Sequence, residues 1–319
     1  MALPDKLNSL PDWSNKASNR WADFIELSCI KNVDHIFSIH DMLDHYSDER
    51  PEDLERGSQE HSAKYDQIVV DMENYFELIK FRSESLEDYY PFELDDSWCI
   101  TLKNDLNDNH LFYLFLLLAS NLAFFDGSTR YALTHAFEDL CCDILEAISS
   151  PLAVTEVFGT SRLEEDDSYR GNLKKRLRSL ASNLCANTTK SLDSDSEYDV
   201  PGGDGGLDLV SYVPIDGMPF IPVSLAQCAC SYDQWQNKQL SISDSIWRAR
   251  YGNLAPYLQF TFVPFYYRKA SGDFENLTTV FTCLIDRHRI FKVIRYHQKA
   301  IENFRKHTIY NKVSDLALA

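Results

Sequence analysis

The most informative stretch of this chain for predicting its fold is Asp204-Gly205-Gly206-Leu207-Asp208-Leu209-Val210-Ser211-Tyr212-Val213. Its glycine pair permits a tight turn, and the apolar, β-branched and aromatic residues that follow are typical of a strand. Residues 215–219 predict a turn, and residues 220–230 predict a second strand. We therefore expect a β-hairpin that is entered through the glycines and has Asp208 at the start of its first strand.

Helices and strands are expected on both sides of this hairpin. Before it, the pattern predicts an apolar helix over 108–125, capped by Asp108, a second helix over 129–149 and a strand over 152–158. A basic helix over 169–186, preceded by Asp166 and Asp167, and a mobile polar loop over about 187–203 are expected next. After it, a helix begins within 233–238, two strands cover 259–267 and 278–285, and a long basic helix covers 287–307. This order predicts an α/β fold with a mixed sheet that is flanked by helices.

The first part of the chain is predicted to be acidic and mainly helical. Apolar residues recur at three- and four-residue steps from 13 to about 82, and residues 97–102 predict a short strand. Residues 41–100 contain 18 Asp or Glu and 5 Lys or Arg, so this segment carries −13 of the total charge of −18. We expect an acidic helical module over 1–105 and an α/β domain over 106–319.

Basic residues gather in two stretches of the second domain. They are Arg170, Lys174, Lys175, Arg176 and Arg178 in the first, and Arg287, Arg289, Lys292, Arg295, Lys299, Arg305 and Lys306 in the second. A helix with such a face could follow the phosphates of a nucleic acid, or it could simply be solvated.

Four residues are candidates for a metal-dependent site. Hydrolysis of a phosphodiester needs carboxylates or amides at fixed places to hold Mg²⁺, and a lysine near the attacking water. Asp208 at the bend of the first strand, Gln227 on the second strand and Glu138 on an earlier helix are the candidate metal ligands. Lys238, on the helix after the hairpin, is the candidate lysine.

Three short motifs carry a resemblance to a known family. Phe137-Glu138, then Gly-Asp-Gly-Gly-x-Asp at 203–208, then Gln227-Cys228-Ala229 resemble the PD-(D/E)XK superfamily, and most closely its Mrr-type branch. That branch has a helix bearing Phe-Glu, then Gly-Asp-Gly-Gly-x-Asp, then Gln-x-Lys. The resemblance implies a restriction-endonuclease-like α/β core over about 128–307. It also implies that Asp208 and Gln227 hold Mg²⁺ or Mn²⁺, with Glu138 as a helper.

The chain departs from this pattern at the lysine. The family's lysine belongs at position 229, where this chain has Ala229. Some members of the superfamily place the lysine on the following helix, pointing into the same site, and Lys238 has that position here. The resemblance therefore implies either a displaced lysine at Lys238 or a site that has lost catalysis and only binds.

Each candidate residue also has a purely structural interpretation. Asp208 could cap a turn, and Gln227 could be a buried amide that satisfies the sheet edge. Glu138 could be a solvated helix residue, and Lys238 an ordinary surface lysine.

Composition indicates the compartment. The eight cysteines are scattered and contain no CxxC pair, which favours reduced, buried thiols over a zinc site or a disulfide framework. The first residues lack the pattern of a secretory signal, and the apolar run 111–125 is too short to span a bilayer. We expect a cytoplasmic protein without a membrane segment.

Three functions are compatible with these observations. The expected one is a metal-dependent nuclease that hydrolyses DNA, as a subunit of a restriction or anti-phage defence system. Its acidic module would dock a protein partner or shield the basic site. The alternative is a catalytically inactive nuclease-fold module that binds nucleic acid or a partner protein. A third is an interaction subunit with no role in nucleic-acid binding, which the strong acidity favours.

Overall fold

The computed structural model describes residues 18–49, 59–158, 169, 171–194, 198 and 203–317. The chain forms two compact units. Unit 1 comprises Met1–Arg130, Phe265–Glu275 and Arg305–Ala319, and unit 2 comprises Tyr131–Pro264 and Asn276–Phe304. The first change of unit, at residue 130, lies beyond the predicted boundary at 105, because helix α5 (Asp108–Ala119) lies against α13 (Thr308–Ala317) within unit 1.

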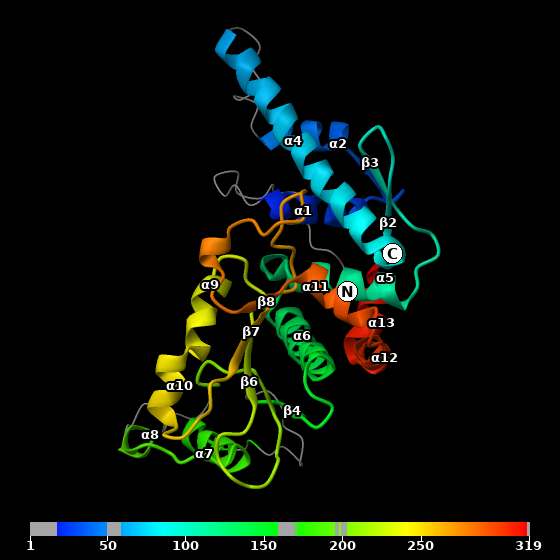
Figure 1. Ribbon diagram of the computed structural model, residues 1–319. Helices are drawn as coiled ribbons and strands as arrows, with labels where there is room; N and C mark the ends of the chain where they lie inside the picture. Colours follow the sequence, from blue (N-terminus) through cyan, green and yellow to red (C-terminus); the bar gives the residue numbers. More distant parts are fainter. Residues whose placement is uncertain are drawn as a thin grey trace. The chain divides into compact units, whose positions relative to one another are not determined.

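Unit 2 is built on a five-stranded mixed sheet (Figure 1). Its strands, in spatial order, are β4 (Val154–Val157), β5 (Leu209–Tyr212), β6 (Val223–Cys228), β7 (Leu258–Phe262) and β8 (Cys283–Ile285). The pairs β4–β5 and β5–β6 are antiparallel, whereas β6–β7 and β7–β8 are parallel. The predicted hairpin is therefore β5–β6, with Leu209 opposite Ala226 and Tyr212 opposite Val223.

Alternating side chains give this sheet two covered faces. Val210 and Leu225 lie in an apolar cluster with Leu177 of α7 (Leu173–Asn183) and Trp247 of α10 (Asp244–Arg250). On the opposite face, the hydroxyl of Ser211 lies 3.0 Å from that of Ser149, which follows α6 (Gly127–Ile148). Unit 2 thus has three layers, and the chain is a mixed α/β protein with helices on both faces of the sheet.

Several predicted elements of unit 2 differ from the observed ones. The basic segment 287–307 is two helices, α11 (Arg287–Ile294) and α12 (Lys299–Lys306), because the side chain of Gln298 donates to the Ile294 carbonyl and the helical ladder stops there. Part of the predicted loop 187–203 is helix α8 (Lys190–Ser194), while 195–197 and 199–202 lie outside the described residues. Asp166 and Asp167 also lie outside them, and Asn172 caps α7 instead.

The connection from β6 to β7 consists of short helical pieces. They are α9 (Trp235–Lys238), the 3-10 helix η5 (Gln239–Ile242) and α10. The hydroxyl of Ser241 lies 2.9 Å from the Gly206 carbonyl and 2.7 Å from the Lys238 carbonyl. This crossover is therefore in contact with the glycine loop that leads to Asp208. A further 3-10 helix, η6 (Leu277–Thr279), precedes β8.

Unit 1 combines helices with a small antiparallel sheet of order β1-β3-β2. Besides α5 and α13, its elements are α1 (Ser18–Lys31), β1 (Ile36–Ser38), α2 (Ile39–Glu49), α4 (Gln59–Leu86), η2 (Glu87–Tyr89), β2 (Phe92–Leu94), β3 (Cys99–Leu102) and η3 (Leu122–Phe124). The strand predicted over 97–102 is β3. The all-helical prediction for 13–82 is wrong at β1, which is only three residues long and pairs with β3.

Helix α5 shows how local chemistry sets the ends of an element. Its N-cap is Asn107 rather than Asp108, since the Asn107 carboxamide oxygen accepts from the backbone N–H groups of Asn109 and His110. The helix ends at Ala119 instead of residue 125, because the side chains of Ser120 and Asn121 both donate to the Leu117 carbonyl.

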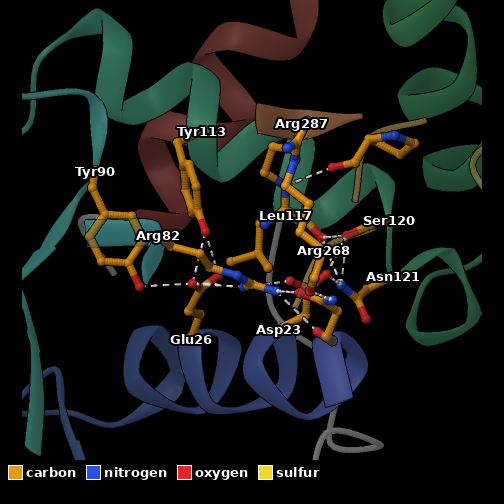
Figure 2. A network of polar contacts seen from close by, with 12 residues as sticks. Asp23, Glu26, Arg82, Tyr90, Tyr113, Leu117, Ser120, Asn121, Arg268 and Arg287 are labelled. Atoms are coloured by element: carbon orange, nitrogen blue, oxygen red, sulfur yellow. Dashed lines mark hydrogen bonds and ion pairs between the residues drawn. The ribbon is translucent and has the colours of Figure 1, made fainter. Parts of the chain in front are cut away.

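A buried polar network lies between α1, α4 and α5 in unit 1 (Figure 2). Nη1 of Arg82 lies 2.8 Å from a carboxylate oxygen of Asp23 and 2.8 Å from one of Glu26. The hydroxyls of Tyr90 and Tyr113 donate to Glu26. Burial alone would lower the pKa of Arg82, but the two carboxylates outweigh it and hold that pKa well above its usual value. This charged core orients three helices of unit 1.

Among the residues that the structure describes, no helix combines the length and the apolar composition that crossing a membrane would require.

Candidate functional site

Asp208 lies at a bend immediately before β5, as predicted. Its backbone N–H donates to the Ala226 carbonyl at 3.1 Å. Its carboxylate oxygen Oδ2 accepts from the backbone N–H of Cys228 at 2.6 Å, so Asp208 is fixed to β6 through both backbone and side chain. The residue is only 4 % exposed.

The pKa of Asp208 is raised well above the ordinary value of an aspartate. Burial is the main cause, and the negative charges of Glu138 and Asp204 add to it. The Cys228 N–H and the charge of Lys238 act in the opposite direction without cancelling them. Three carboxylates and one ammonium group therefore interact electrostatically at this end of the sheet.

Lys238 reaches the hairpin from the crossover. Its Nζ donates to the backbone carbonyl of Cys228 at 3.2 Å, although most of the residue is exposed on α9. Cys228 thus contacts Asp208 through its N–H and Lys238 through its carbonyl. This contact places the ammonium group of Lys238 beside the segment 227–229.

Gln227 lies next to this contact on β6 and is 3 % exposed. The hairpin register, with Leu209 opposite Ala226, brings Asp208 and Gln227 to neighbouring positions at the end of the two strands. On its other side Gln227 is paired with Thr261 of β7.

Glu138 comes from the middle of α6 and is partly exposed. Its carboxylate lies 3.8 Å from Nδ1 of His135, one helical turn earlier. The His135 ring is packed edge-on against Tyr131, with centroids 3.9 Å apart. Glu138 is close enough to Asp208 for its charge to be the largest electrostatic cause of the raised pKa of that aspartate.

The donor set of these residues fits a hard divalent cation. Two carboxylates and an amide offer the oxygen ligands that Mg²⁺ and Mn²⁺ prefer, and a cation would relieve the repulsion between Asp208 and Glu138. No cluster of three or more His, Cys, Asp or Glu side chains arranged to hold a metal occurs in the described part of the chain.

The cysteines around the site are structural. All eight cysteines are free thiols. Burial raises the pKa of Cys141, Cys228 and Cys230, so these thiols stay protonated and are poor nucleophiles.

Two members of the basic stretches are unavailable to a nucleic acid. Arg176 is 1 % exposed and donates to the carbonyls of Phe158 and Gly203. Arg287 is fully buried, and its Nε donates to the Pro264 carbonyl at 2.6 Å. Both alternatives for the basic stretches, a phosphate-binding face and a solvated face, require exposed side chains, and these two arginines are buried. Arg170 lies outside the described residues.

Sequence reasoning missed three contributors to this site. Asp204 adds charge and accepts from the Gly206 N–H at 2.7 Å, which its position two residues before a glycine could have suggested. Ser241 and the backbone of Cys228 contribute contacts that no local pattern encodes.

Comparison with known proteins adds no relative: no protein-family model matches the chain, and neither a curated protein nor a solved structure matches it.

Proposed function

We propose that unit 2 is a metal-dependent nuclease that hydrolyses phosphodiester bonds in DNA. The observation that carries the proposal is the double contact of Cys228. Its N–H binds Asp208 at 2.6 Å and its carbonyl binds Lys238 at 3.2 Å. A carboxylate and an ammonium group are thereby held on either side of one residue at the end of a hairpin.

The chemistry of each candidate residue suggests its role in the proposed reaction. Asp208, Gln227 and Glu138 would hold Mg²⁺ or Mn²⁺. A bound ion of this kind neutralises charge on the phosphate and promotes ionisation of water. Lys238 would orient the attacking water or stabilise the negative charge that develops on the phosphoryl oxygens. The mixed sheet, covered by helices on both faces, supports the proposal because it brings an earlier helix, a hairpin and a crossover helix to one place.

Cleavage of supercoiled plasmid and of single-stranded DNA, with Mg²⁺ or Mn²⁺, tests this proposal. We expect Asp208→Asn and Lys238→Gln each to lower the cleavage rate by roughly 100-fold or more, because each removes a charge that acts in the transition state. Asp216→Asn and Lys312→Gln are matched controls, since both residues are exposed and lie outside the site. Circular dichroism would establish that all four variants are folded.

Metal binding separates the proposed enzyme from the inactive alternative, which Ala229 favours. In an active site, Mg²⁺ or Mn²⁺ should raise the unfolding temperature of the wild type and not that of Asp208→Asn. A wild type that neither cuts DNA nor gains stability with either ion would contradict the proposal and leave a nuclease-like module that binds nucleic acid or a partner protein.

A further inference from the structure

Arg250, the last residue of α10, is a buried cation with two N–H donors that no described residue satisfies. The residue is 7 % exposed. Among the described residues, nothing accepts a hydrogen bond from its buried Nε and Nη1. The contacts that the guanidinium does make are with ring faces, 4.6 Å from the centroid of Trp247 and 5.6 Å from that of Tyr198. Ring faces attract a cation but do not satisfy N–H donors, so a buried guanidinium in this state is energetically unfavourable until an anion binds.

Arg82 and Arg176 are buried to a similar degree, but their Nη atoms bind acceptors. Arg82 binds two carboxylates in unit 1, and Arg176 donates to the Gly203 carbonyl. Near Arg250, the carboxylate of Asp244 is held by Nε of Arg248 at 2.6 Å, and Asp204 accepts from Gly206. These two acids are thus engaged elsewhere.

The guanidinium of Arg250 lies directly against the glycine loop. A Cβ atom added to Gly205 would lie 3.4 Å from Nη1 and 3.5 Å from Nη2 of Arg250. Gly205 has φ +62°, so the absence of a side chain permits both the turn and this close approach. The same Cβ would lie 3.1 Å from a methyl group of Leu173, the first residue of α7. The basic first turns of α7 therefore lie beside this loop.

We propose that Arg250 is the binding site for an oxyanion, namely the phosphate group of a nucleotide. A guanidinium presents a planar fork of donors that matches two phosphate oxygens, and no described residue accepts from Nε or Nη1 of Arg250. Lys174 and Lys175, on α7, increase the positive potential around such an anion.

The position of Arg250 also indicates which phosphate it would bind in a nucleic acid. Gly205 precedes Asp208 by three residues, so their Cα atoms lie at most about 11 Å apart. Phosphates along one strand of duplex DNA recur about every 3.4 Å of axis. Resting on the proposed nuclease function, we assign Arg250 to a phosphate close to the scissile one on the bound strand. The anion binding itself does not depend on that function.

The test measures thermal unfolding of the full chain in EDTA, so that no cleavage takes place. The probe is inorganic phosphate, against sodium chloride at the same ionic strength. We expect phosphate to raise the unfolding temperature of the wild type and of Arg248→Gln, a control on the same helix whose side chain is exposed. In Arg250→Gln, the phosphate concentration that gives half of the effect should rise by roughly 10- to 100-fold. Arg250→Lys, which keeps the charge and loses the fork, should lie between the two and serves if the glutamine variant does not fold.

Two further probes distinguish the source of the phosphate. A single-stranded oligonucleotide that stabilises the chain more than inorganic phosphate at equal phosphate concentration identifies the nucleic-acid backbone as ligand. A mononucleotide that is as effective as the oligonucleotide identifies a free nucleotide. Either result upholds Arg250 as an oxyanion site, whether or not the chain cuts DNA. The inference is overturned if phosphate acts no differently from chloride, or if Arg250→Gln responds as the wild type does.

Discussion

At the scale of the single residue, Gly206 connects the turn chemistry of the loop to the position of Asp208. It has φ +78°, and a Cβ atom built on it would lie only 2.4 Å from the Cβ atom of Ser241. Gly217, in the hairpin turn, has almost the same backbone angle, φ +77°, but nothing lies within 4 Å of its added Cβ. A comparison of alanine substitutions at these two glycines therefore separates the strain of the backbone conformation from the effect of a steric clash.

We predict that Gly206→Ala lowers the free energy of unfolding by roughly 2–4 kcal/mol, since it adds a steric clash to the strain of a positive φ. Gly217→Ala should cost only about 1 kcal/mol, the strain alone. Urea unfolding of both variants measures the difference. Adding Ser241→Gly to Gly206→Ala should recover part of the loss, and equal losses for the two alanine variants would show that the clash is absorbed elsewhere.

At the scale of the element, the start of α5 depends on the protonation state of His110. Nδ1 of this buried residue accepts from the Asn107 N–H, which completes a capping box. Burial lowers the pKa of His110, and the charge of Lys103 lowers it further. The unfolded chain therefore binds a proton more readily than the folded one. The contribution of this neutral histidine is complete above its unfolded pKa of about 6.5 and is lost as the pH falls below that value.

We predict that His110→Gln reduces the acid sensitivity of the fold. Glutamine at this position can accept from the same N–H without titrating. The free energy of unfolding should fall less in the variant than in the wild type between about pH 7.5 and about pH 5.5. All other residues are the same in both proteins, so the informative quantity is the difference between the two decreases in the free energy of unfolding. An identical fall in both would mean that His110 does not contribute to the pH dependence.

At the scale of the whole molecule, the charge is unevenly distributed along the chain. Residues 41–100 carry −13 of the total −18. Within unit 1, a cavity of about 290 Å³ has several of these acids in its lining, namely Glu77, Glu84, Asp95 and Asp96. Removing residues 1–100 would be a poor test of shielding, because it would take α1 and α4 away from the buried network of Arg82 and Glu26.

Substitution of exposed acids tests shielding without disturbing that network. We predict that replacing Glu77, Glu84 and Glu93 together by glutamine raises the affinity for DNA a few-fold at about 50 mM salt, with a smaller gain at about 200 mM. Replacing Asp216, Asp273 and Asp315 by asparagine removes the same charge outside residues 41–100. Fluorescence anisotropy with labelled DNA compares the two triple variants. An equal gain in both would indicate an effect of net charge, and no gain in either would contradict shielding.

Most of the local elements could be predicted from the sequence. Turn residues and alternation located the β5–β6 hairpin with Asp208 at its bend, and apolar periodicity located α5, α6 and α7 to within a few residues at most ends. These signals are contained in neighbouring residues, so one segment suffices to read them. The mixed α/β class followed from the order of the elements.

Contacts between groups that are distant in the chain could not be predicted from the sequence and became visible in the folded structure. The contact of Lys238 with Cys228, the clash position of Ser241 against Gly206 and the burial of Arg176, Arg250 and Arg287 each depend on how elements pack. The basic side chains of the two stretches could not be told apart from the sequence, yet some of them are buried and others are exposed. The burial of a side chain and the charges that surround it depend on contacts between residues far apart in the chain. A local sequence pattern does not specify these contacts, because many different residues can pack at the same place.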